Sequence, residues 1–231
     1  MPIFRLTEKL VFPPVELADS MGRLAIGGDL SSERLLLAYS EGIFPWYGKG
    51  QPVIWWSPDP RLVIFPSDIH ISKSMRRVIN KRDFDISFDK CFRDVITECA
   101  GKREGQNFGT WIMPEMIDAY CKLNEIGYAH SVEVWKDNKL VGGLYGVSIG
   151  TCFFGESMFS RESNASKFAL IKLAKKLEEL SFSVIDCQVY TPLMVSLGAV
   201  EIPRYEFISV LKEGTKKPSL KGNWGELLKT G

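Results

Sequence analysis

Histidine is scarce in this sequence. Only two occur among its 231 residues, His70 and His130, and they lie far apart in the chain. The five cysteines include no CxxC pair, whereas structural zinc sites combine closely spaced Cys and His ligands. We therefore expect no metal. An odd number of cysteines without a disulfide framework favours reduced thiols, which are typical of a cytoplasmic protein.

Long apolar runs are also absent. No stretch of about 18 apolar residues occurs, which excludes a transmembrane helix. The first residues, MPIFRLTEKLVFPP, lack the apolar core of a secretory signal, so we expect a cytoplasmic protein with no membrane partner. Lys and Arg number 29 and Asp and Glu number 28. The overall charge therefore neither favours nor excludes nucleic acid, and only a local patch can decide.

The composition of the chain changes near residue 62. Residues 1–62 are rich in Pro, Gly and Trp and contain one clear helix, which starts at Ser31 or Ser32 and stops at Gly42. We expect a small N-terminal α/β domain there and a larger domain over 63–231. The chain is 45% hydrophobic, which is enough for one large domain or two modest ones.

The larger region alternates strand and helix patterns. Its first expected elements are, in order, a strand RLVIFP, a helix HISKSMRRVINKR, a strand FDISFD and two helices, CFRDVITECA and PEMIDAYCKLNEIG. Three strands in a meander follow, HSVEVW, LVGGLYGVSIG and TCFFGESMF, and then a long helix from near Asn164. The last expected elements are a strand SVIDCQVY, a short helix TPLMVSLGA, a strand YEFISVL and a loosely held basic tail from Lys212. This is the element order of the N-acetyltransferase (GNAT) fold, so the predicted class is α+β with a GNAT-like C-terminal domain.

Glycine is missing from the turn before the long helix. In ordinary GNAT proteins a Gln/Arg-x-x-Gly-x-Gly/Ala turn cradles the pyrophosphate of coenzyme A at the helix N-terminus. Here the turn Ser160–Ala165 reads SRESNA. We therefore expect neither coenzyme A at this turn nor any other cofactor.

The strand SVIDCQVY carries two polar side chains two residues apart. Period two places Asp186 and Gln188 on one face, while Ile185, Cys187 and Val189 take the other and anchor the backbone. A buried carboxylate and amide need hydrogen-bonding partners. Glu156, within FFGESMF, is either solvent-exposed on an edge strand or on the face shared with this polar pair, because strands flanking the long helix are normally neighbours in this topology. The second reading predicts an active site of convergent polar groups in an apolar hollow.

Several longer segments resemble one known family. LAIGGDLSSERLLLAYSEGIFPWY, IWWSPDPR, LVGGLYGV, FFGESMFSRESNASKFAL and IDCQV, with others between about residues 24 and 204, resemble the leucyl/phenylalanyl-tRNA–protein transferases. The resemblance implies a bacterial cytoplasmic enzyme of the N-degron pathway, with a small N-terminal domain and a GNAT-like C-terminal domain. Such an enzyme moves Leu or Phe from aminoacyl-tRNA onto proteins that begin with Arg or Lys. Leakage to Met is also expected, because methylene-scale discrimination is weak.

The resemblance also implies roles for individual residues. Asp186 and Gln188 match the reaction centre and Glu156 lies beside it, while Trp46 and Trp111 match the site for the aminoacyl-adenosine end. We expect Asp186 to deprotonate the attacking amine or to anchor it electrostatically, with Gln188 bonding to the ester carbonyl or to Asp186. Glu156 then supplies charge near the basic acceptor residue or bonds to the Gln188 amide.

Apolar residues near these groups form either ordinary core or a pocket for the transferred amino acid. The candidates are Trp111, Tyr120, Leu144, Phe153, Met158, Leu170 and Ile185. Trp46 is either a core residue or a platform for the terminal adenine of tRNA. His130 is interpreted as a structural hydrogen-bonding residue.

The helix HISKSMRRVINKR separates an apolar face from four cations, Lys73, Arg76, Arg77 and Lys81. They form either a solvated face or a phosphate-binding face for the tRNA acceptor stem. The expected partners are thus Leu-tRNA or Phe-tRNA and the acceptor protein, bound by a monomer. Two other readings stay open: an acetyltransferase that uses acetyl-coenzyme A, and a tRNA-binding or N-degron-binding module without catalysis.

Overall fold

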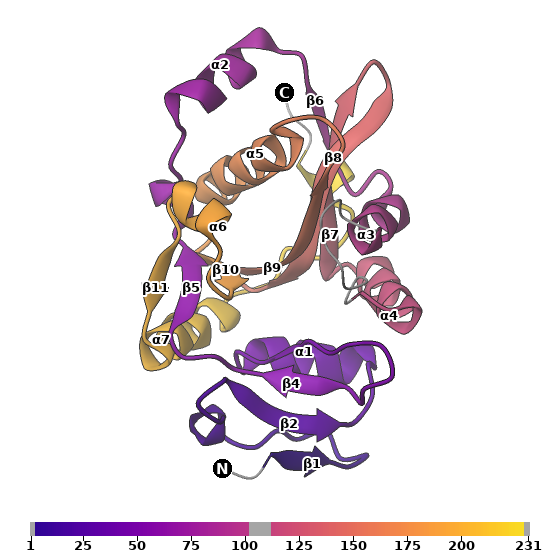
Figure 1. Cartoon of the computed structure of the whole chain (residues 1–231), viewed down its shortest axis with the longest axis vertical. Helices are drawn as coiled ribbons and strands as arrows, with labels where there is room; N and C mark the ends of the chain where they lie inside the picture. Colours follow the sequence, from indigo (N-terminus) through magenta and orange to yellow (C-terminus); the bar gives the residue numbers. More distant parts are fainter. Residues whose placement is uncertain (1–2, 102–111, 229–231) are drawn as a thin grey trace.

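Two β-sheets organise the chain. The computed structural model describes residues 3–101 and 112–228. A four-stranded sheet has the order β1-β2-β4-β3, and a seven-stranded sheet has the order β11-β5-β10-β9-β8-β7-β6 (Figure 1). Within the described ranges, no helix has the length and apolar character needed to cross a membrane.

The smaller sheet holds the N-terminal part of the chain. Its strands are β1 (Phe4–Leu6), β2 (Arg23–Gly27), β3 (Phe44–Pro45) and β4 (Ile54–Trp56), with the 3-10 turn η1 (Val15–Leu17). The helix α1 (Ser32–Ser40) follows β2, and its N-cap Ser31 accepts a hydrogen bond from the amide of Arg34. The predicted helix start is therefore confirmed. Helix α1 also contacts α4, α7 and β8, so it lies between the two sheets.

The larger sheet contains the predicted meander. Its strands are β5 (Arg61–Ile64), β6 (Asp85–Phe88), β7 (Ala129–Lys136), β8 (Lys139–Ile149), β9 (Cys152–Ser160), β10 (Val184–Gln188) and β11 (Val200–Ile202). Strands β7, β8 and β9 pair antiparallel in succession, and β10 pairs parallel to β9. The expectation that the strands flanking the long helix are neighbours is confirmed.

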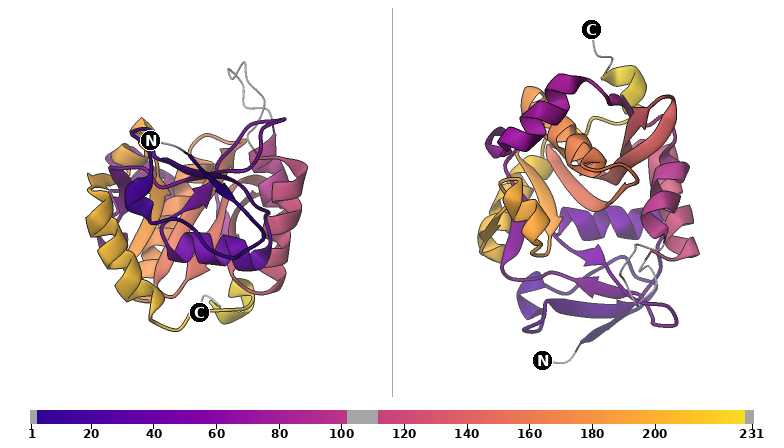
Figure 2. Two further views of the ribbon diagram at one scale, coloured as in Figure 1. Left: turned by 90° about the horizontal axis from the view of Figure 1, so that it is seen from below. Right: turned by 45° about the horizontal axis from the view of Figure 1, so that its top comes forward.

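Helices cover both faces of this sheet. They are α2 (Lys73–Lys81), α3 (Phe92–Ala100), α4 (Pro114–Glu125), α5 (Ala165–Glu179), α6 (Pro192–Ser196), α7 (Arg204–Thr215) and α8 (Trp224–Leu227), with the 3-10 turn η2 (Pro66–Asp68). The long helix α5 lies across one face and α3 with α4 cover the other (Figures 1 and 2). This is the α+β, GNAT-like fold that the element order predicts.

Two predictions near the C-terminus are wrong. The segment YEFISVL is part of helix α7 rather than a strand, because Phe207 and Leu211 lie one turn apart and are both buried. The tail after Lys212 is not loose over its described part. Trp224 in α8 is fully buried, and its backbone amide donates to the Asp89 carboxylate.

The expected division near residue 62 coincides with a change of sheet but not with a break in the core. Strand β5 begins at Arg61 and belongs to the larger sheet. One cluster of buried side chains nevertheless joins Leu24 and Trp55 of the small sheet to Tyr120 and Phe154 of the larger region. The small sheet therefore packs directly on the unit that follows it.

Candidate active site

An apolar hollow opens where strands β9 and β10 diverge. It has a volume of about 370 Å³, within the range of about 300–1,000 Å³ that is typical of small-molecule sites. The lining residues are Phe44, Pro45, Trp46, Leu144, Tyr145, Phe153, Gly155, Glu156, Ser157, Met158, Leu170, Ile185, Cys187, Gln188, Val189, Thr191, Leu193 and Met194. They come from both sheets, from α5, from α6 and from the segment that leads into α6.

The hollow includes most of the residues expected to bind the aminoacyl-adenosine end. Those that line it are Trp46, Leu144, Phe153, Met158, Leu170 and Ile185. Tyr120 does not line it but lies behind Glu156. Trp111 lies outside the described residues.

Glu156 lies in the hollow and accepts three side-chain hydrogen bonds. Tyr39 donates to Oε1 at 2.7 Å, Tyr120 donates to Oε2 at 3.0 Å, and Gln188 Nε2 donates to Oε1 at 2.7 Å. The two tyrosine oxygens also lie within hydrogen-bonding distance of each other. Because each hydroxyl has one proton, either can donate to the other only in place of its bond to Glu156. Glu156 is only 9% exposed, so the solvent-exposed reading is wrong.

The environment of Glu156 raises the pKa of its carboxyl group toward neutral pH. Burial raises the pKa of this carboxyl to about 7, while the hydrogen bonds from Tyr39, Tyr120 and Gln188 oppose the rise. The nearby Asp186 carboxylate raises it further. Burial and the Glu156 carboxylate raise the pKa of both tyrosines well above their usual range, so these hydroxyls stay protonated and act as donors.

Strand β10 does not keep a two-residue period through the site. Gln188 adopts φ 65°, and the pairing of β10 with β5 shifts register between Asp186 and Gln188. Gln188 lines the hollow while Asp186 does not, and Ile185, Cys187 and Val189 line it as well. The expected separation of polar and apolar residues onto two faces is therefore wrong.

Asp186 is fully buried in an ion pair. Arg61 donates to it through Nε at 2.8 Å and through Nη2 at 2.7 Å. Asp186 Oδ1 also accepts the backbone amide of Gln188 at 2.9 Å. Both carboxylate oxygens thus accept hydrogen bonds from protein donors. The sequence did not single out Arg61 or Tyr39 as site residues. Arg61 is the last residue of the segment IWWSPDPR, and Tyr39 lies in the helix predicted to start at Ser31 or Ser32.

Trp46 lies where the small sheet borders the hollow. It is 39% exposed, and its ring packs against Trp56 at a centroid distance of 5.4 Å. Trp56 also donates its indole N–H to the Trp46 carbonyl. An exposed indole held by a second one offers a stacking surface for an aromatic base.

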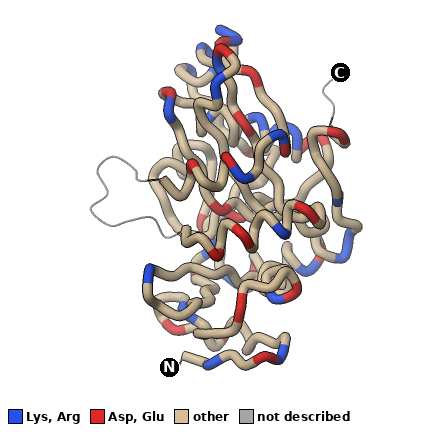
Figure 3. The backbone as a smooth tube through the Cα atoms, turned by 90° about the vertical axis from the view of Figure 1, so that its right-hand side faces the viewer, with Lys and Arg blue, Asp and Glu red and all other residues tan. Residues whose placement is uncertain are grey.

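The basic residues expected to contact phosphates lie on helix α2, at the end of the molecule far from the small sheet. Lys73, Arg76, Arg77 and Lys81 lie on this helix, and Met75 buries the opposite face. Lys81 pairs with Asp83 at 3.7 Å, so an acidic side chain partly neutralises this one of the four cations. Figure 3 shows several Lys and Arg residues at this end of the molecule, with Asp and Glu residues among them.

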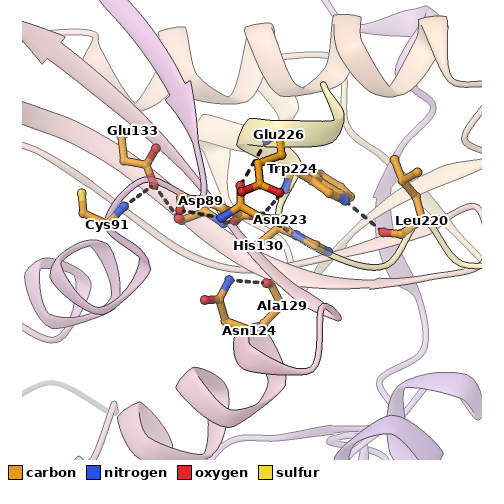
Figure 4. Close-up of polar contacts among 11 residues, drawn as sticks. Asp89, Cys91, Asn124, Ala129, His130, Glu133, Leu220, Asn223, Trp224 and Glu226 are labelled. Atoms are coloured by element: carbon orange, nitrogen blue, oxygen red, sulfur yellow. Dashed lines mark hydrogen bonds and ion pairs between the residues drawn. The ribbon is translucent and has the colours of Figure 1, made fainter. Parts of the chain in front are cut away.

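His130 has the structural role that the sequence suggested. Its Nδ1 lies 2.8 Å from Asp89 Oδ2, and its ring stacks on Trp224 at 3.8 Å (Figure 4). Asp89 also accepts the amides of Ser131 and Trp224. The described residues contain no group of three His, Cys, Asp or Glu side chains that could hold a metal ion.

Comparison with known proteins identifies the family. Residues 63–212 match the family model for leucyl/phenylalanyl-tRNA protein transferase, and residues 28–59 match the model for its N-terminal domain. A leucyl/phenylalanyl-tRNA–protein transferase of Syntrophus aciditrophicus is 55% identical and covers 97% of this chain and 94% of its own length.

Two further proteins are similar to this chain over different shares of its length. The protein of the same name from Syntrophobacter fumaroxidans is 55% identical over 92% of this chain and 91% of its own. Among solved structures, a GCN5-related N-acetyltransferase from Kribbella flavida aligns with a TM-score of 0.37 at 9% identity, covering 72% of this chain and 59% of that one. The family models and the two relatives place this chain in the leucyl/phenylalanyl-tRNA–protein transferase family.

Proposed function

We propose that this protein transfers Leu or Phe, and more weakly Met, from aminoacyl-tRNA to the α-amino group of proteins that begin with Arg or Lys. The observation that carries the proposal is the apolar hollow that ends at Gln188 and Glu156. Leu144, Phe153 and Met158 surround a space suited to an unbranched-Cβ apolar side chain. The unbranched thioether of Met158 adapts to ligands of different shape.

The bonding of Gln188 prepares it to meet the incoming amine. Because Nε2 donates to Glu156, the amide oxygen is the end left to act as acceptor. No hydrogen bond to Gln188 Oε1 occurs within the described residues. In the proposed complex this oxygen accepts an N–H of the acceptor amine and aims the nitrogen lone pair at the ester carbonyl carbon.

The reaction is an aminolysis of an activated ester. The new N–C bond forms as the ester C–O bond to the terminal ribose breaks, and the proton lost by the amine balances the one gained by the ribose hydroxyl. An α-amino group has a pKa of about 7.7–8.0, so an appreciable fraction is neutral near pH 7. Holding the amine and the ester in a reactive geometry can lower the activation barrier by roughly 7–11 kcal/mol. The site therefore acts mainly by orientation.

The two remaining surfaces complete the substrate complex. Trp46 stacks on the terminal adenine, and the cations of α2 contact phosphates of the acceptor stem. The product carries a new N-terminal Leu or Phe, which marks it for degradation by the N-degron pathway. We place this activity in the cytoplasm and assign it to a monomer.

The test is transfer of labelled Phe from Phe-tRNA to peptides that begin with Arg or with Ala. We expect labelling of the Arg peptide only, and a loss of about 10²-fold or more in kcat for Gln188→Ala. Lys175→Ala, on the exposed side of α5, is the matched control and should leave the rate unchanged. Binding of Phe-tRNA without transfer would instead identify a binding module, and acetylation of the peptide from acetyl-coenzyme A would identify an acetyltransferase.

A further inference from the structure

Arg61 is a buried cation that does not line the hollow. Its side chain is 1% exposed and that of its partner Asp186 is 0% exposed. Two parallel hydrogen bonds join them, from Nε to Oδ1 at 2.8 Å and from Nη2 to Oδ2 at 2.7 Å. This bidentate geometry fixes the plane of the carboxylate as well as its position.

Aromatic rings hold the guanidinium group in place. Its central carbon lies 4.8 Å from the centroid of Phe44 and 4.7 Å from that of Phe207. Phe44 belongs to β3, two residues before Trp46, and it lines the hollow. Phe207 belongs to α7. The cation therefore contacts the small sheet, helix α7 and strand β10.

The ion pair reaches the hollow through the backbone of Gln188. Asp186 Oδ1, already bonded to Arg61, accepts the Gln188 N–H at 2.9 Å. Gln188 has φ 65°, a left-handed conformation that a residue with a side chain seldom adopts without support. With the backbone in that conformation, the side-chain amide of Gln188 reaches Glu156, and its Nε2 donates to the Glu156 carboxylate at 2.7 Å.

We propose that Arg61 is a positioning residue for aminoacyl transfer: it fixes Asp186, which holds Gln188 in the left-handed conformation that presents its amide to the hollow. The inference rests on the proposed function for its kinetic consequence but not for its structural one. It also reassigns Asp186, because a carboxylate neutralised by a bidentate arginine and buried away from the hollow orients a neighbour rather than accepting a proton.

Lysine cannot replace this arginine. A primary ammonium group is a point donor without the planar fork that meets both carboxylate oxygens. Arg61→Lys therefore keeps the charge and loses the orientation, whereas Arg61→Met loses both. Arg61→Met also leaves the Asp186 carboxylate buried without a positively charged partner, which strongly destabilises a folded protein. The double variant Arg61→Met/Asp186→Asn removes that uncompensated charge and keeps the test interpretable.

The kinetic test measures kcat and KM for Phe-tRNA in these variants, alone and combined with Gln188→Ala. We expect kcat to fall about 10²-fold in Arg61→Lys and in the double variant, since small displacements of a positioning group have effects of this size. The KM for Phe-tRNA should change less than about threefold. In a Gln188→Ala background the Arg61 substitutions should have no further effect, because coupled residues are not additive.

A control variant and a crystal structure separate positioning from general stability. Arg34 is also a fully buried arginine, bonded to the Thr7 carbonyl and to Asp29, and it does not line the hollow. Arg34→Lys should lower stability while leaving kcat unchanged. In a crystal structure of Arg61→Met/Asp186→Asn, Gln188 should leave its left-handed conformation and lose its bond to Glu156.

The outcomes distinguish the role of Arg61 from the proposed function. Retention of the Gln188–Glu156 bond in that crystal structure would overturn the role of Arg61, whatever the activity. So would effects of the Arg61 and Gln188 substitutions that simply multiply. Failure of the wild-type protein to transfer Phe would overturn the proposed function, while the crystal structure would still decide the role of Arg61.

Discussion

At the scale of single residues, the site depends on a carboxyl group placed where ionisation is unfavourable. Glu156 is buried, and its three side-chain partners Tyr39, Tyr120 and Gln188 all donate to it. Those donors favour the ionised form of the carboxyl, whereas burial favours the neutral form. Burial has the larger effect, and the pKa of the carboxyl therefore rises to about 7. Near neutral pH both forms are therefore populated.

This balance predicts a dependence of stability on pH. The pKa of the carboxyl is ordinarily 4.5 and is about 7 in the folded protein, so the folded state binds the proton more tightly. The resulting stabilisation is fully present below about pH 4.5 and is lost as the pH rises through about 7. We expect the free energy of unfolding of the wild type to fall relative to that of Glu156→Gln as the pH rises from about 5 to about 8. Urea unfolding across that range measures the difference, and a constant difference would contradict the prediction.

The sequence predicted which residues approach one another but not how they bond. Glu156 stood out as a carboxyl in an apolar run, and the neighbouring strands brought it near Gln188 as expected. The spacing of Asp186 and Gln188 wrongly predicted that both side chains lie on one face. The left-handed turn at Gln188 has no local signal, because it is supported by the Asp186 carboxylate and that carboxylate is held by Arg61, 125 residues away. Tyr39 contacts Glu156 across 117 residues, so neither partner could be found from local pattern.

At the scale of elements, helix α2 packs one face into the core and presents basic side chains on the other. Ser72 caps its first turn by accepting the Met75 amide, and Met75 packs into the core that α5 shares. The opposite side carries Lys73, Arg76 and Arg77, and Asp83 partly neutralises Lys81. The first three cations are therefore the better candidates for phosphate binding.

A salt titration tests that assignment. Replacing Lys73, Arg76 and Arg77 together with Gln should weaken tRNA binding and reduce the slope of log K against log salt by roughly 0.7–0.9 for each phosphate that is no longer neutralised. Filter binding at several salt concentrations measures the slope. The control is Lys175→Gln with Lys176→Gln on α5, whose side chains pair with Glu178 and Glu179. An unchanged slope in the α2 variant would show that this face is only solvated.

Helix α7 shows where reasoning from local propensity fails. Its residues Tyr, Phe, Ile and Val are typical of strands, but tertiary packing can override this intrinsic strand propensity. Phe207 and Leu211 are spaced for a helix, and Phe207 packs over Arg61. That contact involves another element of the fold, so the sequence alone favoured the wrong element. The meander and α5 were predictable because their apolar periods are long and unbroken.

At the scale of the whole molecule, the C-terminal segment closes one side of the larger sheet. Trp224 stacks on His130, and its amide bonds to Asp89 at 2.8 Å (Figure 4). Its indole N–H donates to the Leu220 carbonyl at 3.0 Å. Trp224 therefore joins the end of the chain to strand β7 through its ring and to the segment after β6 through its backbone amide.

Removal of the Trp224 indole should strongly destabilise the folded protein. We expect Trp224→Ala to lower the free energy of unfolding by about 3–5 kcal/mol, because it empties a buried site of large volume. Tyr205→Ala, at a position 72% exposed, is the matched aromatic control and should change stability by less than about 0.5 kcal/mol. Urea unfolding compares the two, and a decrease at Trp224 no greater than that at Tyr205 would contradict the prediction.

The core that passes from Leu24 and Trp55 to Tyr120 and Phe154 has a consequence for folding. A segment that buries its apolar side chains against a later part of the chain has little to stabilise it until that part is made. The N-terminal segment up to β4 should therefore remain unfolded as it leaves the ribosome and fold with the rest in one cooperative step. Amide hydrogen exchange would then protect β2 and β9 with the same free energy of opening.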